Sequence, residues 1–366
     1  MKLLKYSLLL ILIVTFHSNN IKSQILSERA EISLITSNPG TEIYIYFGHS
    51  AIRVKDPLKG IDWVYNYGTF DFNTPNFYTK FARGYLNYKL SVYPMRYFVQ
   101  ENRHENRSIY EQVLNLNQEE KELVFRFLEN NRQPGNEYYL YDFFFDNCAT
   151  RIRDVFQDEL GKDLVFDEAI YEPITFREML APYLEPHAWS RFGINLVLGA
   201  IADRKATLAE STFLPGYLKT AFANAKLNNK DFAQPSKILF QQKDVDLNTS
   251  IFLRPGFVFV ALLLIILFFT YREFKTRKTY KLIDFFVFLF IGIIGLILFL
   301  LWTATSHTAV VKNWNLIWAI PTHFFIVVFI FRKAKSVYLK YYFLVSGILA
   351  ISVFGFLVRN STVNMI

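Results

Sequence analysis

The sequence contains a single cysteine, Cys148, among its 366 residues. One thiol cannot form an internal disulfide, and it excludes a zinc site built from several cysteines. The chain has no internal repeat, which argues against a repeat architecture. Between residues 24 and 250 there is also no long apolar run, and charged and aromatic residues are spaced there as in an ordinary globular domain.

The apolar residues are instead concentrated toward the C-terminus. Of all residues, 52% are hydrophobic, with 38 Phe and 22 Tyr, which is too apolar for a purely water-soluble protein. After residue 250 they form four long runs, at 256–271, 283–302, 314–331 and 338–358. Each run can cross a bilayer, the first with help from its flanking residues, so the sequence predicts a four-helix transmembrane region.

The basic residues predict how these helices are oriented. Two of the three connectors between the runs are rich in them: the first carries Arg272, Lys275, Arg277, Lys278 and Lys281, and the third carries Arg332, Lys333 and Lys335. The second connector has only Lys312. Basic connectors stay in the cytoplasm, so residues 24–250 and the C-terminus are expected outside. Several of the basic residues behind the net charge of +8 lie in these connectors, so nucleic-acid binding is not expected.

The N-terminus has the pattern of a secretory signal peptide. Lys2 and Lys5 precede an apolar run over residues 6–16, and Ser23 is a small residue suited to a cleavage point. The run is short for a membrane span, so an uncleaved anchor is the weaker alternative. The predicted organisation is a signal peptide at 1–23, an exported catalytic domain at 24–227, a linker at 228–250 and the transmembrane domain at 251–366. The expected location is the bacterial inner membrane, with several passes.

Short alternating segments predict strands in the exported domain, at 31–35, 42–47, 51–54 and 63–67. Helices are expected over 117–130, where acidic residues fill the first turn, and from about 147 to 160, with Gly161 at the end. The expected fold class is therefore α+β, with a small antiparallel sheet followed by the transmembrane helices.

Two positions carry residue types suited to nucleophilic catalysis. Cys148 stands where an aromatic extended run gives way to a predicted helix, and a helix N-terminus lowers a thiol pKa and offers amide donors to an oxyanion. His49 stands in a predicted strand, and a neighbouring imidazole would complete the activation of the thiol. The alternatives are a buried structural cysteine and a histidine of the core. The polar neighbours of Cys148, among them Asp146 and Arg151, favour the catalytic interpretation.

The sequence also resembles a known family. The stretches that carry the resemblance are GHSA at 48–51, VYNYGTFDF at 64–72, PNFY at 75–78, GYLNY at 84–88, DNCATR at 146–151 and FLP at 213–215. Together they are similar to the bacterial Lnb family of lipoprotein N-acyltransferases, within the permuted papain-like thiol enzymes. The resemblance implies an enzyme without cofactor or metal. It would move an acyl chain from a lipid ester, through a cysteine thioester, to the N-terminal amine of a lipoprotein. The expected partners are diacylglyceryl lipoproteins and membrane phospholipid, and the sequence names neither the acyl donor nor whether transfer occurs within one lipoprotein or between molecules.

The same resemblance implies roles for individual residues. Cys148 would be the nucleophile and His49 the general base. Asn66 would orient the imidazole, with Asp71 behind it. The residues expected to hold the cysteine turn or to contact a lipid head group are Tyr141, Asn147 and Arg151.

Two other functions remain open at this point. A papain-like peptidase or amidase acting on cell-wall peptide would use the same Cys148 and His49, but with a wide polar cleft in place of an apolar groove. A non-catalytic membrane scaffold would need no contact between the two residues. In the predicted membrane region, His307, Asn315 and His323 are possible further functional residues, although an ordinary structural role is equally open to them.

Overall fold

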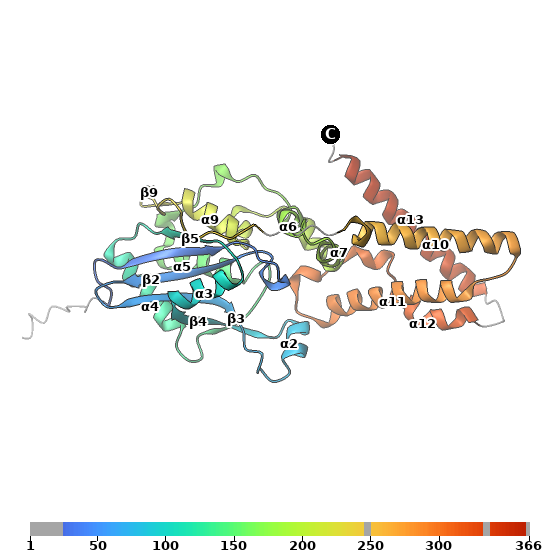
Figure 1. The fold of residues 1–366 in the computed structure, drawn as a ribbon, viewed down its shortest axis with the longest axis horizontal. Coiled ribbons are helices and arrows are strands. Elements are labelled where there is room, and N and C mark those ends of the chain that lie inside the picture. Colours follow the sequence, from blue (N-terminus) through green and yellow to red (C-terminus); the bar gives the residue numbers. More distant parts are fainter. Residues whose placement is uncertain (1–24, 245–249, 332–336, 364–366) are drawn as a thin grey trace, which may run out of the picture.

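A computed structural model describes residues 25–244, 250–331 and 337–363 of the chain. An N-terminal sheet domain is followed along the long axis by a group of apolar helices (Figure 1). The expected α+β class with C-terminal apolar helices is confirmed. The predicted signal peptide at 1–23 and the basic third connector lie outside the described residues.

A seven-stranded antiparallel sheet forms the centre of the N-terminal domain. Its strands, in spatial order, are β10 (Lys237–Phe240), β5 (Ile109–Val113), β1 (Glu31–Ser37), β2 (His49–Asp56), β3 (Ile61–Thr69), β4 (Asn87–Pro94) and β6 (Tyr138–Leu140). The first three strands of the chain pair in sequence, with Ser37 opposite His49 and Ile52 opposite Tyr65. His49 therefore begins a strand at the middle of the sheet.

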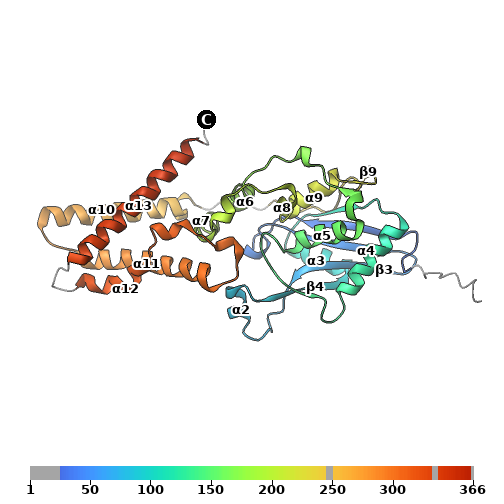
Figure 2. The ribbon, with the colours of Figure 1, turned by 180° about the vertical axis from the view of Figure 1, so that it is seen from behind.

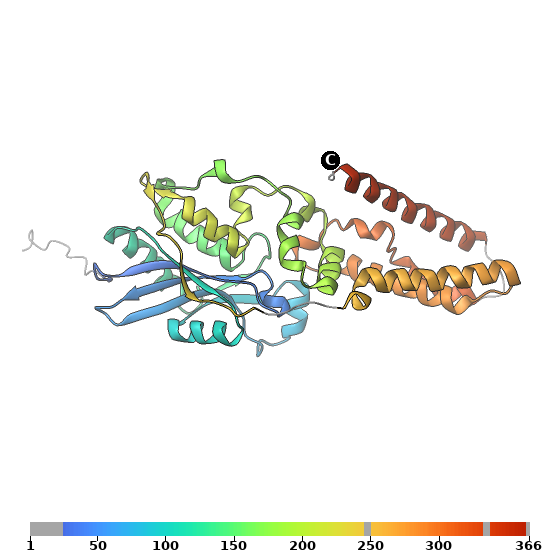
Figure 3. The same cartoon turned by 45° about the horizontal axis from the view of Figure 1, so that its top comes forward.

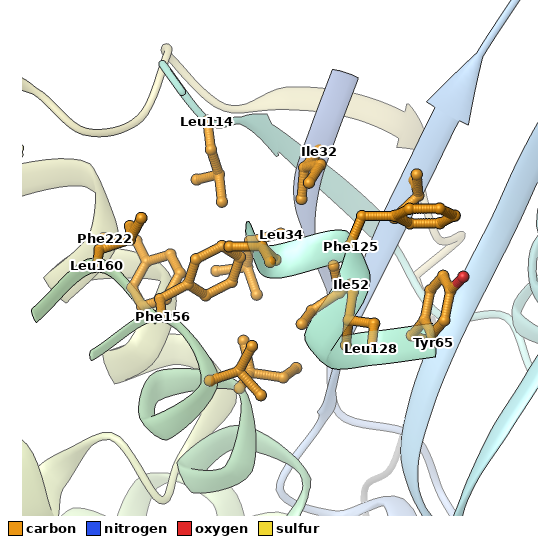
Figure 4. Close-up of a cluster of buried hydrophobic side chains, with 14 of the residues drawn as sticks. Ile32, Leu34, Ile52, Tyr65, Leu114, Phe125, Leu128, Phe156, Leu160 and Phe222 are labelled. Carbon is orange, nitrogen blue, oxygen red and sulfur yellow. The ribbon is translucent and has the colours of Figure 1, made fainter. Parts of the chain in front are cut away.

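Helices cover both faces of this sheet. On one face lie α4 (Gln118–Asn131), α5 (Cys148–Leu160) and α9 (Pro215–Asn224), and their apolar side chains meet those of the strands in the main core (Figure 4). On the other face lies α3 (Met95–His104), where Met95 and Phe98 pack on Ile35 and Ala51 (Figure 3). Because strand side chains alternate between faces, Leu34 and Ile52 point to the first core while Ile35 and Ala51 point to the second.

The two predicted helices of this domain are present, and each begins at a capping residue. Asn117 caps α4 by accepting from the backbone N–H of Glu120, whose side chain bonds back to the cap. Asn147 and Thr150 form the same reciprocal arrangement at the start of α5, and Gly161 follows its last residue. A capping box satisfies N–H groups that have no partner inside the helix, so it fixes where the helix begins.

The segment 42–47 differs from the predicted strand. It contains a single 3-10 turn, η1 (Ile43–Ile45), in which Ile45 N–H bonds to Glu42 O. Gly40 N–H in turn bonds to Ile45 O, which closes the loop between β1 and β2. The alternating pattern here reflects contacts of Ile45 and Tyr46 with the core.

The segment 228–250 was predicted to be a linker, but its described first half belongs to the sheet domain. Lys237–Phe240 forms the edge strand β10 on β5, and Lys230–Asp231 forms β9 in a three-stranded sheet with β8 (Lys226–Leu227) and β7 (Leu164–Val165). The nearby Phe232 is fully buried and Ala233 is nearly so, which anchors the segment to the core. Residues 245–249 of the predicted linker lie outside the described residues.

A second core lies between the sheet domain and the membrane helices. Its buried side chains come mostly from α6 (Phe176–Leu184), η4 (Ala200–Asp203) and the residues around Phe144 and Phe213. The other short elements of the domain are α2 (Phe77–Arg83), η2 (Gly161–Asp163), η3 (Glu168–Ile170), α7 (Ala188–Val197) and α8 (Leu208–Ser211). The rings of Phe144, Phe176 and Phe213 pack in tilted and edge-to-face arrangements, with centroids 4.5 to 5.5 Å apart. This core holds the segment that precedes Cys148.

The membrane part consists of η5 (Ile251–Leu253), α10 (Pro255–Thr276), α11 (Lys281–Ala304), η6 (Thr308–Val310), η7 (Trp314–Ile317), α12 (Thr322–Ile326), η8 (Val327–Phe331) and α13 (Val337–Val363). Among the described residues, three segments are long and apolar enough to cross a membrane: α10, α11 and Trp314–Phe331. Within α13, residues Val337–Val353 form a shorter apolar stretch.

The third of these segments is not one regular helix. It is built from η7, α12 and η8, with Pro321 at the break, and it packs closely on α11. A Cβ on Gly292 would lie 2.3 Å from Phe324 N, and one on Gly295 would lie 2.1 Å from Ala319 O. Two glycines on α11 thus allow its backbone contact with the irregular segment, as small residues do where membrane helices meet closely.

Candidate functional site

The structure brings Cys148 and His49 together. Cys148 is the first residue of α5 and His49 the first of β2, and their side chains are close enough for each to shift the pKa of the other. Gly68 of β3 lies beneath both: a Cβ placed on it would be 3.4 Å from Cys148 Cβ and 3.9 Å from His49 Cε1. Gly68 has a φ of +88°, which an L side chain rarely adopts. The three elements therefore meet at one point, where the positive φ favours a glycine and an added Cβ would touch both side chains.

Asn66 holds the imidazole from its other side. His49 Nε2 lies 2.5 Å from Asn66 Oδ1, and Asn66 Nδ2 donates to the hydroxyl of Tyr93 at 2.7 Å. Since the Oδ1 atom accepts, Nε2 carries the proton that it receives. The Nδ1 atom is then the ring nitrogen left for the thiol. The arrangement fixes both the orientation and the tautomer of His49.

The electrostatics of the pair favour a charged form. Burial opposes charge on both groups, but the interaction with His49 outweighs it and lowers the pKa of Cys148 below the ordinary thiol value. Burial likewise acts to lower the pKa of His49, but the Cys148 sulfur outweighs that effect and raises it. The backbone N–H groups of Ser50 and Ala149, near the sulfur, also act to lower the pKa of Cys148. Each group therefore favours the charged form of the other, which makes the thiolate more accessible than that of an ordinary buried cysteine.

Asn147 shapes the turn that presents the cysteine. Its Oδ1 accepts from the N–H groups of Ala149 and Thr150, at 2.8 and 3.0 Å, and caps the helix. Its Nδ2 donates to Phe143 O and Phe213 O, both at 2.9 Å. Asn147 is buried, so all four bonds are shielded from water. Asn147 therefore stabilises the turn that holds Cys148 in position.

Arg151 is engaged in contacts within the protein. Its guanidinium forms a two-pronged ion pair with Asp146 and lies 4.0 Å from the ring centroid of Tyr139. A planar bidentate pair of this kind fixes the positions of both side chains. Arg151 therefore supports the cysteine turn. A lipid head group could contact the Arg151 guanidinium only alongside Asp146, which already binds it.

Asp71 does not take the place expected for it behind Asn66. Its carboxylate accepts from Asn73 N at 2.8 Å and Asn73 Nδ2 at 3.0 Å, in an exposed turn after β3. The partner of the Asn66 side-chain amide is instead Tyr93, on the neighbouring strand β4. The chain leaves the sheet after Thr69, which carries Asp71 into a local turn stabilised by its own carboxylate.

Tyr141 lies near the thiol. Its ring stacks on that of Tyr88, with centroids 4.4 Å apart. Burial, and then the charge of Cys148, raise the pKa of Tyr141 well above its usual value, so the phenol stays neutral beside the thiolate.

Two tyrosines at the site were not identified from the sequence. Tyr93 holds Asn66, and Tyr139 is buried with its hydroxyl 3.9 Å from the Cβ position above Gly68. Aromatic residues on strands are ordinary sheet formers, so their identity carries no signal. The one local clue is Gly68, because a glycine inside a strand marks a bulge or a close approach.

The membrane part contacts the cysteine turn directly. Thr308, in the loop after α11, donates to Asp142 Oδ2 at 2.5 Å. The other oxygen of Asp142 accepts from the N–H groups of Phe144 and Phe145, at 3.0 and 2.9 Å. Because these residues lead into Asn147 and Cys148, the C-terminal end of α11 is linked through one carboxylate to the segment that precedes Cys148.

The other polar residues singled out in the membrane region have structural partners. Asn315 Nδ2 donates to Leu196 O at 3.0 Å, at the end of α7. His307 Nε2 lies 3.1 Å from Phe81 O, and His323 Nδ1 lies 2.8 Å from the hydroxyl of Tyr342. None of these contacts reaches Cys148.

A cavity of about 340 Å³ lies beside α5 and is lined by Tyr67, Phe127, Asn131, Phe145, Asp146, Arg151, Asp154, Val155 and Asp158. Neither Cys148 nor His49 belongs to this lining, so the cavity is separate from the thiol. Within the described part of the chain, no group of three or more His, Cys, Asp or Glu side chains is arranged to hold a metal ion.

The fold and the site define a class: a membrane-anchored protein whose α+β domain presents a thiol at a helix start, next to a histidine. Comparison with protein families gives the affiliation. Residues 17–181 match the Lnb N-terminal periplasmic domain, and residues 247–363 match the Lnb transmembrane domain. The chain belongs to the Lnb-type family and is a bacterial membrane protein with a periplasmic domain. Comparisons with curated proteins and with solved structures gave no match.

Proposed function

We propose that this protein is a thiol-dependent acyltransferase that moves an acyl chain from a membrane phospholipid to the N-terminal amine of diacylglyceryl lipoproteins. The observation that carries the proposal is the row of Cys148, His49 and Asn66: the cysteine stands at a helix N-terminus beside the imidazole, and Asn66 holds the imidazole by a hydrogen bond. A thiolate, a base and a group that orients the base are the parts that nucleophilic acyl transfer requires. A non-catalytic scaffold gives no reason for this arrangement.

In the first half-reaction, the Cys148 thiolate attacks the carbonyl carbon of the phospholipid ester and a C–S bond forms. The carbonyl oxygen becomes an oxyanion, for which N–H groups at the start of α5 are suitable donors. When the oxyanion collapses, the ester C–O bond breaks and the His49 imidazolium gives its proton to the leaving alkoxide. The products are a lysophospholipid and an acyl thioester on Cys148.

In the second half-reaction, the lipoprotein amine attacks the thioester carbonyl and an amide bond forms. His49, now neutral, takes the proton that the amine nitrogen loses. The C–S bond breaks, and the thiolate and the imidazolium are restored. His49 returns to the protonation state in which it began, so no external acid or base is consumed.

The contact between the membrane part and the cysteine turn supports a membrane substrate. Thr308 follows the end of α11 and bonds to Asp142, so the thiol is held close to the outer end of a helix long enough to span the bilayer. Both proposed substrates lie in the bilayer, and a tethered thiol meets them at a high effective concentration. A soluble wall peptide would gain nothing from this placement.

The proposed orientation puts the sheet domain and the loop around Thr308 on the outer side of the inner membrane, with Lys275 in the cytoplasm. In a Cys148→Ser background, a cysteine at position 275 should react with a membrane-impermeant reagent only after the membrane is opened. Reaction in intact spheroplasts would reverse the topology.

Mass spectrometry of lipoprotein N-termini tests the function. Cells with the wild-type protein should carry one more amide-linked acyl chain on their lipoproteins than cells lacking it, and Cys148→Ser should not restore the chain. Unchanged lipoproteins together with altered wall peptides would establish a peptidase or amidase in place of the acyltransferase.

A further inference from the structure

An exposed aromatic segment adjoins the membrane part. It covers the turn after β3, helix α2 and the turn after that helix, residues 70–85, and is called here the aromatic segment. Its solvent-exposed rings are Phe72 (69% exposed), Tyr78 (80%), Phe81 (50%) and Tyr85 (48%). This many exposed large rings on consecutive turns is unusual for a surface in water, and such a patch marks a surface that binds something.

Hydrogen bonds fix this segment at the outer end of α11 (Figures 1 and 2). Ser306 N–H donates to Arg83 O at 2.9 Å, and Ser306 Oγ donates to Gly84 O at 2.7 Å. His307 Nε2 lies 3.1 Å from Phe81 O. Ser306 comes two residues after Ala304, where α11 ends. Because α11 has the length and hydropathy of a membrane span, α2 lies at the level where that span leaves the bilayer.

The composition of the segment suits a membrane interface. Aromatic rings are enriched at the boundary between acyl chains and head groups, and long basic side chains reach from there to lipid phosphates. Besides its four exposed rings, the segment carries Lys80 and Arg83 in the last turn of α2, and the Arg83 guanidinium lies 5.2 Å from the ring centroid of Tyr85. It contains one acidic residue, Asp71, which is bound to Asn73.

A row of rings continues from this segment to the thiol. Phe77 of α2 packs on Phe70, with centroids 5.7 Å apart. Phe70 contacts Tyr88 at 5.2 Å, and Tyr88 stacks on Tyr141 at 4.4 Å. Tyr141 is close enough to Cys148 for the charge of the sulfur to act on its phenol.

We propose that the aromatic segment inserts into the outer leaflet at the membrane interface, binds a phospholipid there, and leads its acyl ester to Cys148 along Phe70, Tyr88 and Tyr141. The delivery step rests on the proposed acyltransferase function. The membrane contact does not, because it follows from the position of α2 at the end of α11.

Depth-dependent quenching tests the membrane contact. The full chain, in a Cys148→Ser background, receives one cysteine by Tyr78→Cys, is labelled with an environment-sensitive fluorophore, and is placed in vesicles of phosphatidylethanolamine and phosphatidylglycerol. Lipids brominated near the carbonyl end should quench this probe strongly. The matched control is Tyr97→Cys, since Tyr97 is 50% exposed on α3 of the sheet domain. Equal quenching at both positions, or a Tyr78 probe that responds only to added lipoprotein, would overturn the proposal.

Kinetics test the delivery step. The double variant Phe72→Ser/Tyr78→Ser should raise the KM for phospholipid about tenfold, since two apolar contacts with lipid are lost. The rate of Cys148 alkylation by iodoacetamide should not change, and neither should the KM of the Tyr97→Ser control. An unchanged KM with reduced kcat would overturn the delivery step. If the wild-type protein transfers no acyl chain, the function is wrong, while the quenching result stands separately.

A second inference concerns Tyr139. Its side chain is 8% exposed, and its hydroxyl has no hydrogen-bond partner among the described residues. Leaving a buried hydroxyl unpaired costs free energy, so such a group in a folded protein requires an explanation. The hydroxyl lies 3.9 Å from the point above Gly68 at which Cys148 Cβ and His49 Cε1 also converge. It thus points into the site where a carbonyl would be attacked.

We infer that the Tyr139 hydroxyl donates a hydrogen bond to the oxyanion that forms when Cys148 attacks the ester. Burial raises the pKa of Tyr139 well above its usual value, and the nearby Cys148 sulfur adds to this effect, so the phenol keeps its proton as a donor. Arg151, whose guanidinium stacks on the ring, holds it in place.

Tyr139→Phe removes only the oxygen, so it separates catalysis from structure. The rate of p-nitrophenolate release from a p-nitrophenyl acyl ester should fall about 100-fold, the usual effect of losing one oxyanion donor. Alkylation of Cys148, which forms no oxyanion, should proceed at the wild-type rate. The control is Tyr138→Phe, since Tyr138 is the exposed neighbour on the same strand. Release at the wild-type rate, or equal losses in release and alkylation, would contradict the inference.

Discussion

His49 and Asn66 face each other from neighbouring strands, with Nε2 of the imidazole 2.5 Å from Oδ1 of the amide. Asn66 is itself held by the hydroxyl of Tyr93, at 2.7 Å. The imidazole is therefore fixed by a side chain that cannot ionise. It turns Nδ1 toward the thiol without adding a negative charge that would compete with the thiolate for the imidazolium.

Replacing Asn66 should weaken catalysis without abolishing it. Asn66→Ala leaves the thiol and the base in place but frees the ring to rotate, and misplacement of a catalytic group by about 1 Å costs on the order of 100-fold in rate. We expect kcat of acyl transfer to fall by about that factor, with detectable residual activity. His49→Ala and Cys148→Ser should both be inactive in the same assay. An Asn66→Ala protein as inactive as His49→Ala would mean that Asn66 does more than orient the ring.

The mutual pKa shifts of Cys148 and His49 predict different pH profiles for alkylation of the thiol and for acyl transfer. Alkylation of Cys148 should reach half its maximal rate below the ordinary thiol value of about 8.5 and then stay constant, because the pKa of Cys148 is lowered by His49. Acyl transfer should rise over the same range but fall again at higher pH, when His49 loses the proton needed by the leaving group.

His49→Ala supplies the control for these profiles. Burial alone raises the pKa of the thiol, so the alkylation midpoint should move to higher pH when the imidazole is removed. Because Cys148 is the only cysteine, the modified protein needs no further substitution to make the signal specific. An alkylation midpoint that His49→Ala leaves unchanged would show that the histidine does not activate the thiol.

Alanine substitutions at two glycines with positive φ distinguish the effect of backbone strain from the effect of a new contact with Cys148. Gly68→Ala places a Cβ 3.4 Å from Cys148 Cβ, whereas Gly60→Ala meets no atom within 4 Å. Their φ values are +88° and +66°, so both variants should lose about 1–2 kcal/mol of unfolding free energy from backbone strain. Only Gly68→Ala should also slow the alkylation of Cys148. Denaturant unfolding and alkylation rates measure the two effects, and equal alkylation rates in both variants would contradict the close approach at Gly68.

Parts of this site could be predicted from the sequence because their signals are local. The acidic first turn indicated where α4 begins, and the change from an aromatic extended run to a helical pattern placed Cys148 at the N-terminus of α5. The pairing of β1, β2 and β3 in chain order then makes it natural for His49 and Asn66 to be neighbours. Short-range patterns of this kind are the most dependable part of a sequence.

Other parts depend on contacts between distant segments and left no local pattern. Thr308 bonds to Asp142 across 166 positions of the chain, and Tyr139 reaches the site only because β6 pairs with β4. The edge strand Lys237–Phe240 was missed because its pattern is only four residues long. Asp71 was misplaced because a sequence cannot show that the chain turns away after Thr69.

The most direct test of the account is the mass of Cys148 after the purified full-length protein meets phospholipid without an acceptor. The account predicts that the peptide containing Cys148 gains one acyl chain, that neutral hydroxylamine removes it, and that an added diacylglyceryl peptide takes it up as an amide. Under the same conditions, His49→Ala should gain none. An unmodified Cys148 in a wild-type protein that still transfers acyl chains would contradict the account, because transfer would then proceed without a thioester.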